Sequence, residues 1–175
     1  EGEGEEDRNH DRAGREDQRL LTGTGRYVDD VVLPRQTFVA FVRSPHAHAR
    51  VRSVDVAAAR KAPGVVAVFT GADLLADGIG SFPIGAGLTN AASKPMDAAP
   101  LYPLATDAAR FVGQTVAAVI AETRLQAEDA EEQVMVDYEE LPAVVTLEAA
   151  TRSGAARLWP GAPGNDRLNV RPSLP

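Results

Sequence analysis

The sequence predicts an α+β domain in which a mixed sheet has helices packed on one side. Short apolar segments with the composition of buried strands recur along the chain, and helix-capping signals stand between some of them. Strict alternation of strands and helices is absent. A length of 175 residues and a hydrophobic fraction of 44% fit one globular domain, and 5% aromatics leave its core mainly to Val, Ala and Leu.

Six segments have the composition of strands and are bounded by polar or turn-forming residues. The segment 116–121 is continuously apolar and predicts a central strand. Gly113, just before it, suggests a bulge or a close backbone approach. In chain order, the predicted strands are residues 38–42, 51–54, 65–69, 116–121, 134–138 and 143–145.

Capping signals predict the helices. Thr123 and Gln126 match a capping box, with Gln126 able to reach back to the cap nitrogen. The helix that follows places Ala127, Ala130 and Val134 on one stripe, and its two alanines predict a close approach to the sheet. Shorter helices are predicted over 56–62 after Asp55, after Thr70 with Asp73 three residues later, and over 147–150 after Thr146.

The remaining segments set the domain boundaries. Residues 1–16 are charged and predict a disordered acidic arm, with an interaction tail as the alternative. Residues 76–109 lose periodicity and are rich in Gly and Pro, so we expect either a loop that lies against polypeptide outside this chain or a mobile insert. Residues 166–175 form an irregular tail, which leaves 17–165 as the folded domain.

Composition argues against several classes of function. The net charge of -7 disfavours binding to nucleic acid, and no apolar run approaches the roughly 20 residues that cross a membrane. The absence of cysteine excludes disulfides, thiolate catalysis and cysteine-ligated iron–sulfur clusters. No export signal stands at the start of the sequence, so we expect a cytoplasmic location.

His46 and His48 are the first candidate site residues. In an extended segment they share a face and supply two ligands of a metal site, but no third ligand stands at a diagnostic spacing. A turn at a strand end, with hydrogen-bonded or interfacial imidazoles, is the favoured interpretation. Ser44 beside His46 lacks the sequence of a nucleophile elbow, which argues against serine hydrolysis.

Other candidate motifs are weak. Gly23-Thr24-Gly25 lacks the third glycine of a dinucleotide loop and predicts a tight turn, and 26–30 then predicts a strand or turn. The paired carboxylates Asp29-Asp30 and Glu139-Glu140 would point to opposite faces of a strand, which favours turn or surface roles. These motifs single out no catalytic, cofactor-binding or metal-binding residue in this chain.

A set of segments in fixed order resembles a known family. The set is similar to the N-terminal α/β hammerhead domain of the molybdenum hydroxylase large subunit, the family of xanthine dehydrogenase, aldehyde oxidase and carbon monoxide dehydrogenase. The similarity covers roughly residues 15 to 165. The segments are Leu20–Asp30, Arg43–Arg50, Pro63–Leu74, Arg110–Val119, Ala127–Glu131 and Val136–Pro142.

The resemblance implies a structural or assembly domain of a molybdopterin-dependent oxidoreductase that hydroxylates aldehydes, N-heterocycles or carbon monoxide. It implies molybdopterin, iron–sulfur centres and FAD for the complete enzyme, none of them bound by this chain. The implied partners are the molybdopterin-binding region of the large subunit and the iron–sulfur and FAD subunits. The candidate interface residues are Ser44, His46, His48, Gly113 and Gln114.

The alternative is a stand-alone hammerhead module for binding or assembly, with no enzymatic role. The substrate and the oligomeric state stay open at this point. Also open is whether the chain is part of a longer subunit, a separately encoded subunit or a degenerate fragment.

Overall fold

The computed structural model describes residues 18–83 and 99–161. The chain divides into two compact units, unit 1 (Glu1–Gln36) and unit 2 (Thr37–Pro175), and each is treated on its own. The predicted arm 1–16 and the predicted tail 166–175 lie outside the described residues, so these two predictions stay untested.

Unit 1, from residue 18 onward, consists of local turns. A helical turn at 18–21 ends where Gly25 donates its backbone N–H to the Arg19 carbonyl oxygen at 2.9 Å. Gly23 has φ +70°, in the left-handed region that glycine adopts without strain. The glycine–threonine–glycine segment is therefore a tight turn, as expected. A 3-10 helix, η1 (Val28–Asp30), follows, which agrees with the turn alternative for 26–30 and not with the strand.

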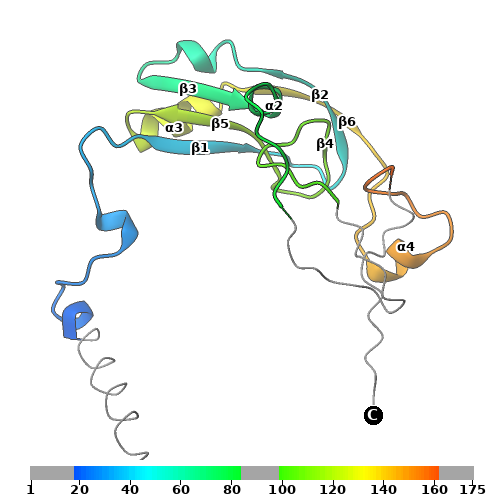
Figure 1. The fold of residues 1–175 in the computed structure, drawn as a ribbon, viewed down its shortest axis with the longest axis horizontal. Helices are drawn as coiled ribbons and strands as arrows, with labels where there is room; N and C mark the ends of the chain where they lie inside the picture. The colour runs from blue at the N-terminus through cyan, green and yellow to red at the C-terminus, as the bar shows by residue number, and fades with distance from the viewer. Residues whose placement is uncertain (1–17, 84–98, 162–175) are drawn as a thin grey trace, which may run out of the picture. The chain divides into compact units, whose positions relative to one another are not determined.

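Unit 2 contains two three-stranded sheets (Figure 1). The first has the order β1 (Phe38–Arg43), β5 (Thr115–Ala121), β3 (Val65–Thr70). The second has the order β4 (Ala108–Ala109), β2 (Ala49–Asp55), β6 (Met135–Glu140).

The α+β class is confirmed, but the strands do not form the single mixed sheet that was expected. Every pairing among the described strands is antiparallel. After β1 the chain turns a corner at 44–48, so β2 pairs with β6 and β4 instead of continuing beside β1. Pro45 favours this corner because it cannot donate a ladder hydrogen bond.

Strand β5 is central in the first sheet, which explains its continuous apolar sequence. It pairs with β1 on one side, from Phe38 opposite Ala121 to Arg43 opposite Thr115, and with β3 on the other. Most of its side chains are buried. A strand covered on both faces needs apolar side chains at successive positions instead of alternate ones.

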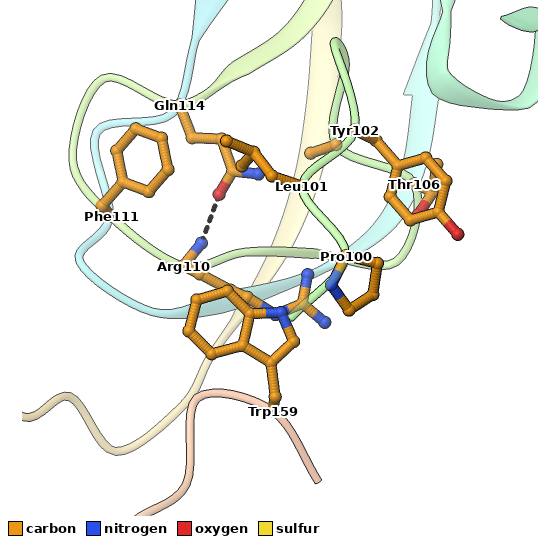
Figure 2. A pocket seen from close by; sticks show the side chains of 9 residues that line it. Pro100, Leu101, Tyr102, Thr106, Arg110, Phe111, Gln114 and Trp159 are labelled. Carbon is orange, nitrogen blue, oxygen red and sulfur yellow. Dashed lines mark hydrogen bonds between the residues drawn. The ribbon is translucent and has the colours of Figure 1, made fainter. Parts of the chain in front are cut away.

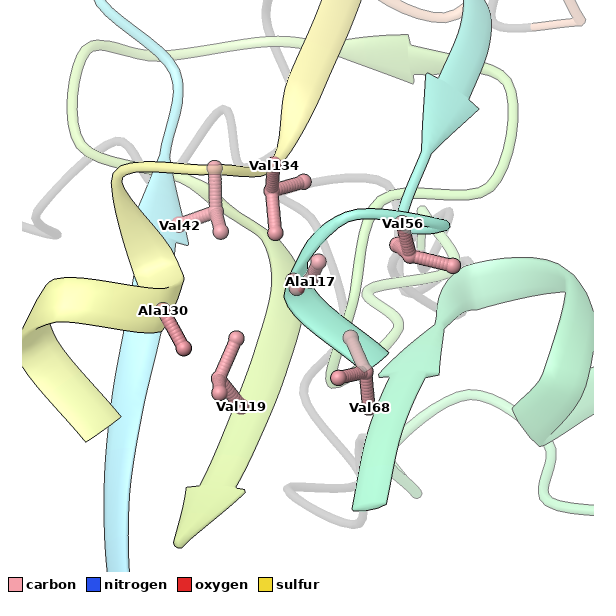
Figure 3. Packing of buried hydrophobic residues seen from close by; sticks show 8 residues of the cluster. Val42, Val56, Val68, Ala117, Val119, Ala130 and Val134 are labelled. Carbon is pink, nitrogen blue, oxygen red and sulfur yellow. The ribbon is translucent and has the colours of Figure 1, made fainter. Parts of the chain in front are cut away.

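Helix α3 (Arg124–Glu131) covers one face of this sheet, against β1 and β5. The predicted stripe is confirmed: Ala127, Ala130 and Val134 are all buried. Figure 3 shows Ala130 directed at Val119 of β5, inside a cluster of valines and alanines. The small alanine side chains let the helix approach the sheet closely.

The cap of α3 differs from the expected box in one bond. The Thr123 hydroxyl accepts the N–H of Gln126 at 3.2 Å, as expected. The Gln126 side-chain oxygen accepts the Thr123 hydroxyl proton at 2.9 Å, whereas a bond from the cap nitrogen was expected. The Gln126 side chain also lies over Gly64, whose φ is +76° and where a Cβ atom would collide with it.

The shorter helices agree with the sequence at two of three places. Thr70 caps the start of helix α2 (Gly71–Ala76) and Thr146 caps the start of α4 (Leu147–Thr151), both as predicted. The helix expected over 56–62 is only a 3-10 turn, η2 (Ala59–Lys61), because Pro63 leaves too few residues for stable α-helical turns.

Residues 143–145 are also not the strand that was expected. Among the described residues they pair with no other strand, and the Val145 side chain is exposed. No helix in the described ranges 18–83 and 99–161 is long and apolar enough to cross a membrane.

Candidate functional site

The corner between β1 and β2 joins four of the five candidate residues by hydrogen bonds. Ser44 donates its backbone N–H to the Gln114 carbonyl oxygen at 2.9 Å, and Gly113 donates its own to the Ser44 carbonyl oxygen at 2.8 Å. The Ser44 hydroxyl accepts the N–H of His46 at 3.1 Å, a local turn bond. Ser44 is 1% exposed, so its hydroxyl supports the turn and is not placed to attack a substrate.

The two imidazoles have separate partners. His46 meets the Tyr138 ring edge-on at 4.8 Å between ring centroids, and its Nδ1 lies 3.5 Å from a Glu140 carboxylate oxygen. His48 is buried, with Nδ1 2.9 Å from the Pro142 carbonyl oxygen. Because a carbonyl only accepts, Nδ1 of His48 carries the proton. The arrangement agrees with hydrogen-bonded imidazoles at a strand end.

Tyr138, under the His46 ring, is held as a neutral phenol. Burial raises its pKa above the ordinary value, and the neighbouring Ser44 hydroxyl only partly opposes that rise. Its surroundings are those of a packed side chain in β6 and favour no acid–base role at neutral pH.

Gly113 lies in a turn, and the bulge or close backbone approach expected for it is not found. Gln114 donates its N–H to the Phe111 carbonyl oxygen at 3.2 Å, and Gly113 between them has φ +86°. A Cβ atom added at Gly113 would meet nothing within 4 Å. The position needs glycine for its left-handed backbone, as the third residue of a tight turn.

The Gln114 side chain fixes the next segment. It is buried, and its oxygen accepts the backbone N–H of Arg110 at 2.6 Å (Figure 2). Both residues border a small cavity of about 10 Å³, together with Trp159. This volume holds at most about one water, so it is no ligand pocket.

Arg110 is a structural residue that sequence reasoning missed. Its guanidinium binds both carboxylate oxygens of Asp107, at 3.0 and 2.7 Å, and donates to the Leu158 carbonyl oxygen at 2.9 Å. It also lies 5.5 Å from the centre of the Trp159 ring, as Figure 2 shows. The i, i+3 spacing of Asp107 and Arg110 was visible in the sequence, but the contacts with 158–159 depend on the tertiary path.

The Asp107 carboxylate is electrostatically coupled to Arg110. Burial acts to raise its pKa, but the hydrogen bonds and positive charge of Arg110 outweigh burial, so the pKa is lowered. Arg50 and Arg52 similarly engage Glu139, at 3.1 and 3.4 Å. The charged groups of this region are thus paired within the chain.

A wider hollow of about 510 Å³ opens beside these pairs. Its donors include His48, Arg50 and Arg110, whose bonds to Pro142, Glu139 and Asp107 are described above. An anionic cofactor would compete with those acceptors, most of all at Arg110, whose guanidinium nitrogens are all bonded within the chain. The hollow therefore favours no molybdopterin site, since a phosphate needs hydrogen-bond donors that are free.

The first sheet has a second, apolar face. In β1 the buried Ala40 and Val42 face α3, so the alternate residues Val39 and Phe41 point the other way and are 51% and 40% exposed. Exposed large apolar side chains at alternate positions of a strand are typical of an interaction face.

The comparisons with known proteins agree with this architecture. Residues 22–142 match the family model described as the aldehyde oxidase and xanthine dehydrogenase a/b hammerhead domain. The carbon monoxide dehydrogenase large chain of Afipia carboxidovorans is 45% identical over 130 residues, covering 74% of this chain and 15% of that protein. The xanthine dehydrogenase molybdenum-binding subunit of Escherichia coli O157:H7 is 38% identical over 141 residues, covering 81% and 18%.

A solved structure shows the same fold. Quinoline 2-oxidoreductase from Pseudomonas putida 86 superimposes with a TM-score of 0.72 at 45% identity, covering 86% of this chain and 18% of that one. The chain thus has the fold of a domain that also occurs in these relatives. It belongs to the aldehyde oxidase and xanthine dehydrogenase hammerhead family, and it spans less than a fifth of the length of these relatives.

Proposed function

We propose that this chain is the hammerhead domain of a molybdopterin-dependent hydroxylase large chain and serves its assembly, without a catalytic site of its own. The observation that carries the proposal is the family match combined with coverage of only 15% of the carbon monoxide dehydrogenase large chain. Most of such a protein would lie outside this sequence. Molybdopterin supplies the hydroxylation chemistry when bound there, and iron–sulfur and FAD partners receive the electrons.

The internal pairing of polar groups supports this assignment. Ser44, His48 and Gln114 are buried and hold the β1–β2 corner through bonds within the chain. Of the predicted interface residues, His46 and Gly113 keep partial exposure. We assign them direct contacts with the catalytic region, and the three buried residues an indirect role through the shape of the corner.

The outer face of the first sheet is the second part of the proposed interface. Exposed Val39 and Phe41 suit burial against another apolar surface, which would remove them from water. The substrate, whether an aldehyde, an N-heterocycle or carbon monoxide, would be selected by the catalytic region that this face supports.

Affinity capture tests the proposed function. A tagged copy of this chain, produced in its native host, is expected to retain a molybdenum-containing polypeptide together with iron–sulfur and FAD partners. Mass identification and metal analysis of the eluate provide the measurement. Recovery of the chain without any such partner would contradict the proposal and favour a stand-alone module, and stoichiometric molybdenum on the chain alone would contradict the absence of a catalytic site.

A further inference from the structure

Unit 1 exposes far more apolar surface than a self-contained segment should. Within residues 18–36, every position except Gly25 and Gln36 is exposed. Seven large apolar side chains are among the exposed residues: Leu20, Leu21, Tyr27, Val28, Val31, Val32 and Leu33. Leu21, Val28 and Val32 are 87%, 89% and 83% exposed, close to the values of an isolated side chain in water. Such a density of exposed apolar residues marks an interaction surface.

Several polar groups of this segment are nevertheless bonded to one another. The Thr22 hydroxyl donates to the Gln18 carbonyl oxygen at 2.7 Å, and the N–H of Tyr27 donates to the Asp30 carboxylate at 2.9 Å. The N–H of Leu33 donates to the Gln36 side chain at 3.0 Å. These three local turns bond the polar groups to one another and leave the apolar side chains directed outward, so ordering on contact costs less than for a free chain.

The comparisons show that this segment is part of the shared domain. The match to quinoline 2-oxidoreductase covers 86% of this chain, more than unit 2 contains, so it extends into unit 1. The family model also begins inside the segment, at residue 22. The segment therefore belongs to the shared domain, and in that relative more than four-fifths of the polypeptide lies beyond the matched part.

We propose that residues 18–36 form a docking segment whose apolar side chains insert into an apolar surface of the catalytic region of the large chain. This inference rests on the proposed function, since the occupant is that region. Val28 and Val32, the most exposed branched side chains outside the helical turn, are the anchors, and the η1 turn at Val28–Asp30 fixes the first of them.

The double substitution Val28→Asp and Val32→Asp tests the docking segment. The tagged 175-residue chain is co-expressed with the polypeptide that follows it in the large chain, and the captured amount per tagged chain is measured. We expect at least about a tenfold loss of capture, because two carboxylates would be buried without partners. The melting temperature of the tagged chain should not change, because both side chains are exposed in it.

A matched control replaces two exposed apolar residues outside the segment with aspartate. Leu125 on α3 and Val145 before α4 are also exposed apolar residues, and Leu125→Asp with Val145→Asp should keep capture within about twofold. The proposal of a docking segment would be overturned if the control lost as much capture. It would also be overturned if the chain with Val28→Asp and Val32→Asp kept full capture. Failure of the unaltered chain to capture anything would instead sink the proposed function.

Sedimentation of the chain alone tests whether a second copy of the chain, and not the catalytic region, covers the segment. If a second copy covered the segment, the unaltered chain would dimerise with rising concentration and the double variant would not. We expect both to sediment as monomers. A dimer that the substitutions dissolve would assign the segment to self-association and overturn the proposal.

Discussion

Arg110 joins parts of unit 2 that are distant in sequence. Its side chain contacts Asp107 three residues earlier and Leu158 and Trp159 almost fifty residues later. Gln114 holds its backbone from a third direction. The Arg110 guanidinium, with this number of partners, fixes the path of the chain after α4. The Asp107 carboxylate that it binds responds to pH.

The Asp107→Asn substitution should change the pH dependence of stability. The pKa of Asp107 is lower in the folded chain than its ordinary value of 3.8, because Arg110 outweighs burial. Its stabilising contribution is therefore present above about pH 4 and is lost as the pH falls through the folded pKa. We expect the unfolding free energy of the substituted chain to differ from the original above about pH 4 and to converge with it below, as measured by urea unfolding across pH.

Arg110→Met provides the matching background for this test. Without the guanidinium, Asp107→Asn should no longer alter the pH profile, because the group that lowers the pKa is gone. A gap of constant size at every pH in the original background would show that the Asp107–Arg110 pair does not contribute through ionisation.

Ala130→Leu tests the contact of α3 with the sheet. Ala130 is completely buried, points toward Val119 and belongs to the same cluster as Val42, so three added carbons would have to displace close-packed neighbours. We expect a loss of about 1–3 kcal/mol in the free energy of unfolding, measured by chemical denaturation. Asp129→Leu, on the exposed side of the same helix, should stay near the original stability. Unchanged melting of Ala130→Leu would place that alanine away from the sheet.

At the scale of elements, local sequence signals predicted where strands and helices lie but not which strands pair. The apolar run 116–121 predicted β5, and threonine caps predicted the starts of α2, α3 and α4, because both signals act over a few residues. The division of strands into two sheets depends on which strands meet after the corner at 44–48. That choice is set by contacts far apart in sequence and was not predicted.

Two element errors have local physical causes. The segment 56–62 contains helix-forming alanines, but Pro63 stops it before the helix gains enough hydrogen bonds to offset nucleation. The segment 143–145 is β-branched and apolar, yet strand formation requires a partner, and the described residues offer none.

Thr70→Ala tests the cap of α2. The Thr70 hydroxyl and backbone N–H both donate to the Asp73 carboxylate at 2.7 Å, and these bonds lower the pKa of Asp73. Removing the hydroxyl should cost about 1 kcal/mol of stability, measured by denaturant unfolding. Thr151→Ala, which removes a hydroxyl bonded to carbonyls inside α4, is the control and should cost less. A larger loss at Thr151 would show that the cap of α2 contributes little.

At the scale of the whole molecule, the resemblance of the sequence predicted the family. The structure then brought the predicted interface residues together at the corner formed by 44–48. Sequence order could not show that Ser44, His48 and Gln114 would be buried, because burial depends on how the two sheets and the 155–160 segment surround them. Nor did it predict the exposed apolar side chains of unit 1. Those residues have the composition of a core, and only the structure shows that their side chains are exposed.

The alanines between α3 and the first sheet impose an asymmetry on sequence change. Ala40, Ala121 and Ala127 form one small cluster there, and Ala130 belongs to the larger one. An alanine at these positions can be replaced by a smaller residue only if that residue is glycine. A larger residue would push the helix away from the sheet. Among oxidoreductases that share this contact between helix and sheet, sequence differences are therefore expected on the outer strands and loops. The distance between the helix and the sheet is expected to stay constant.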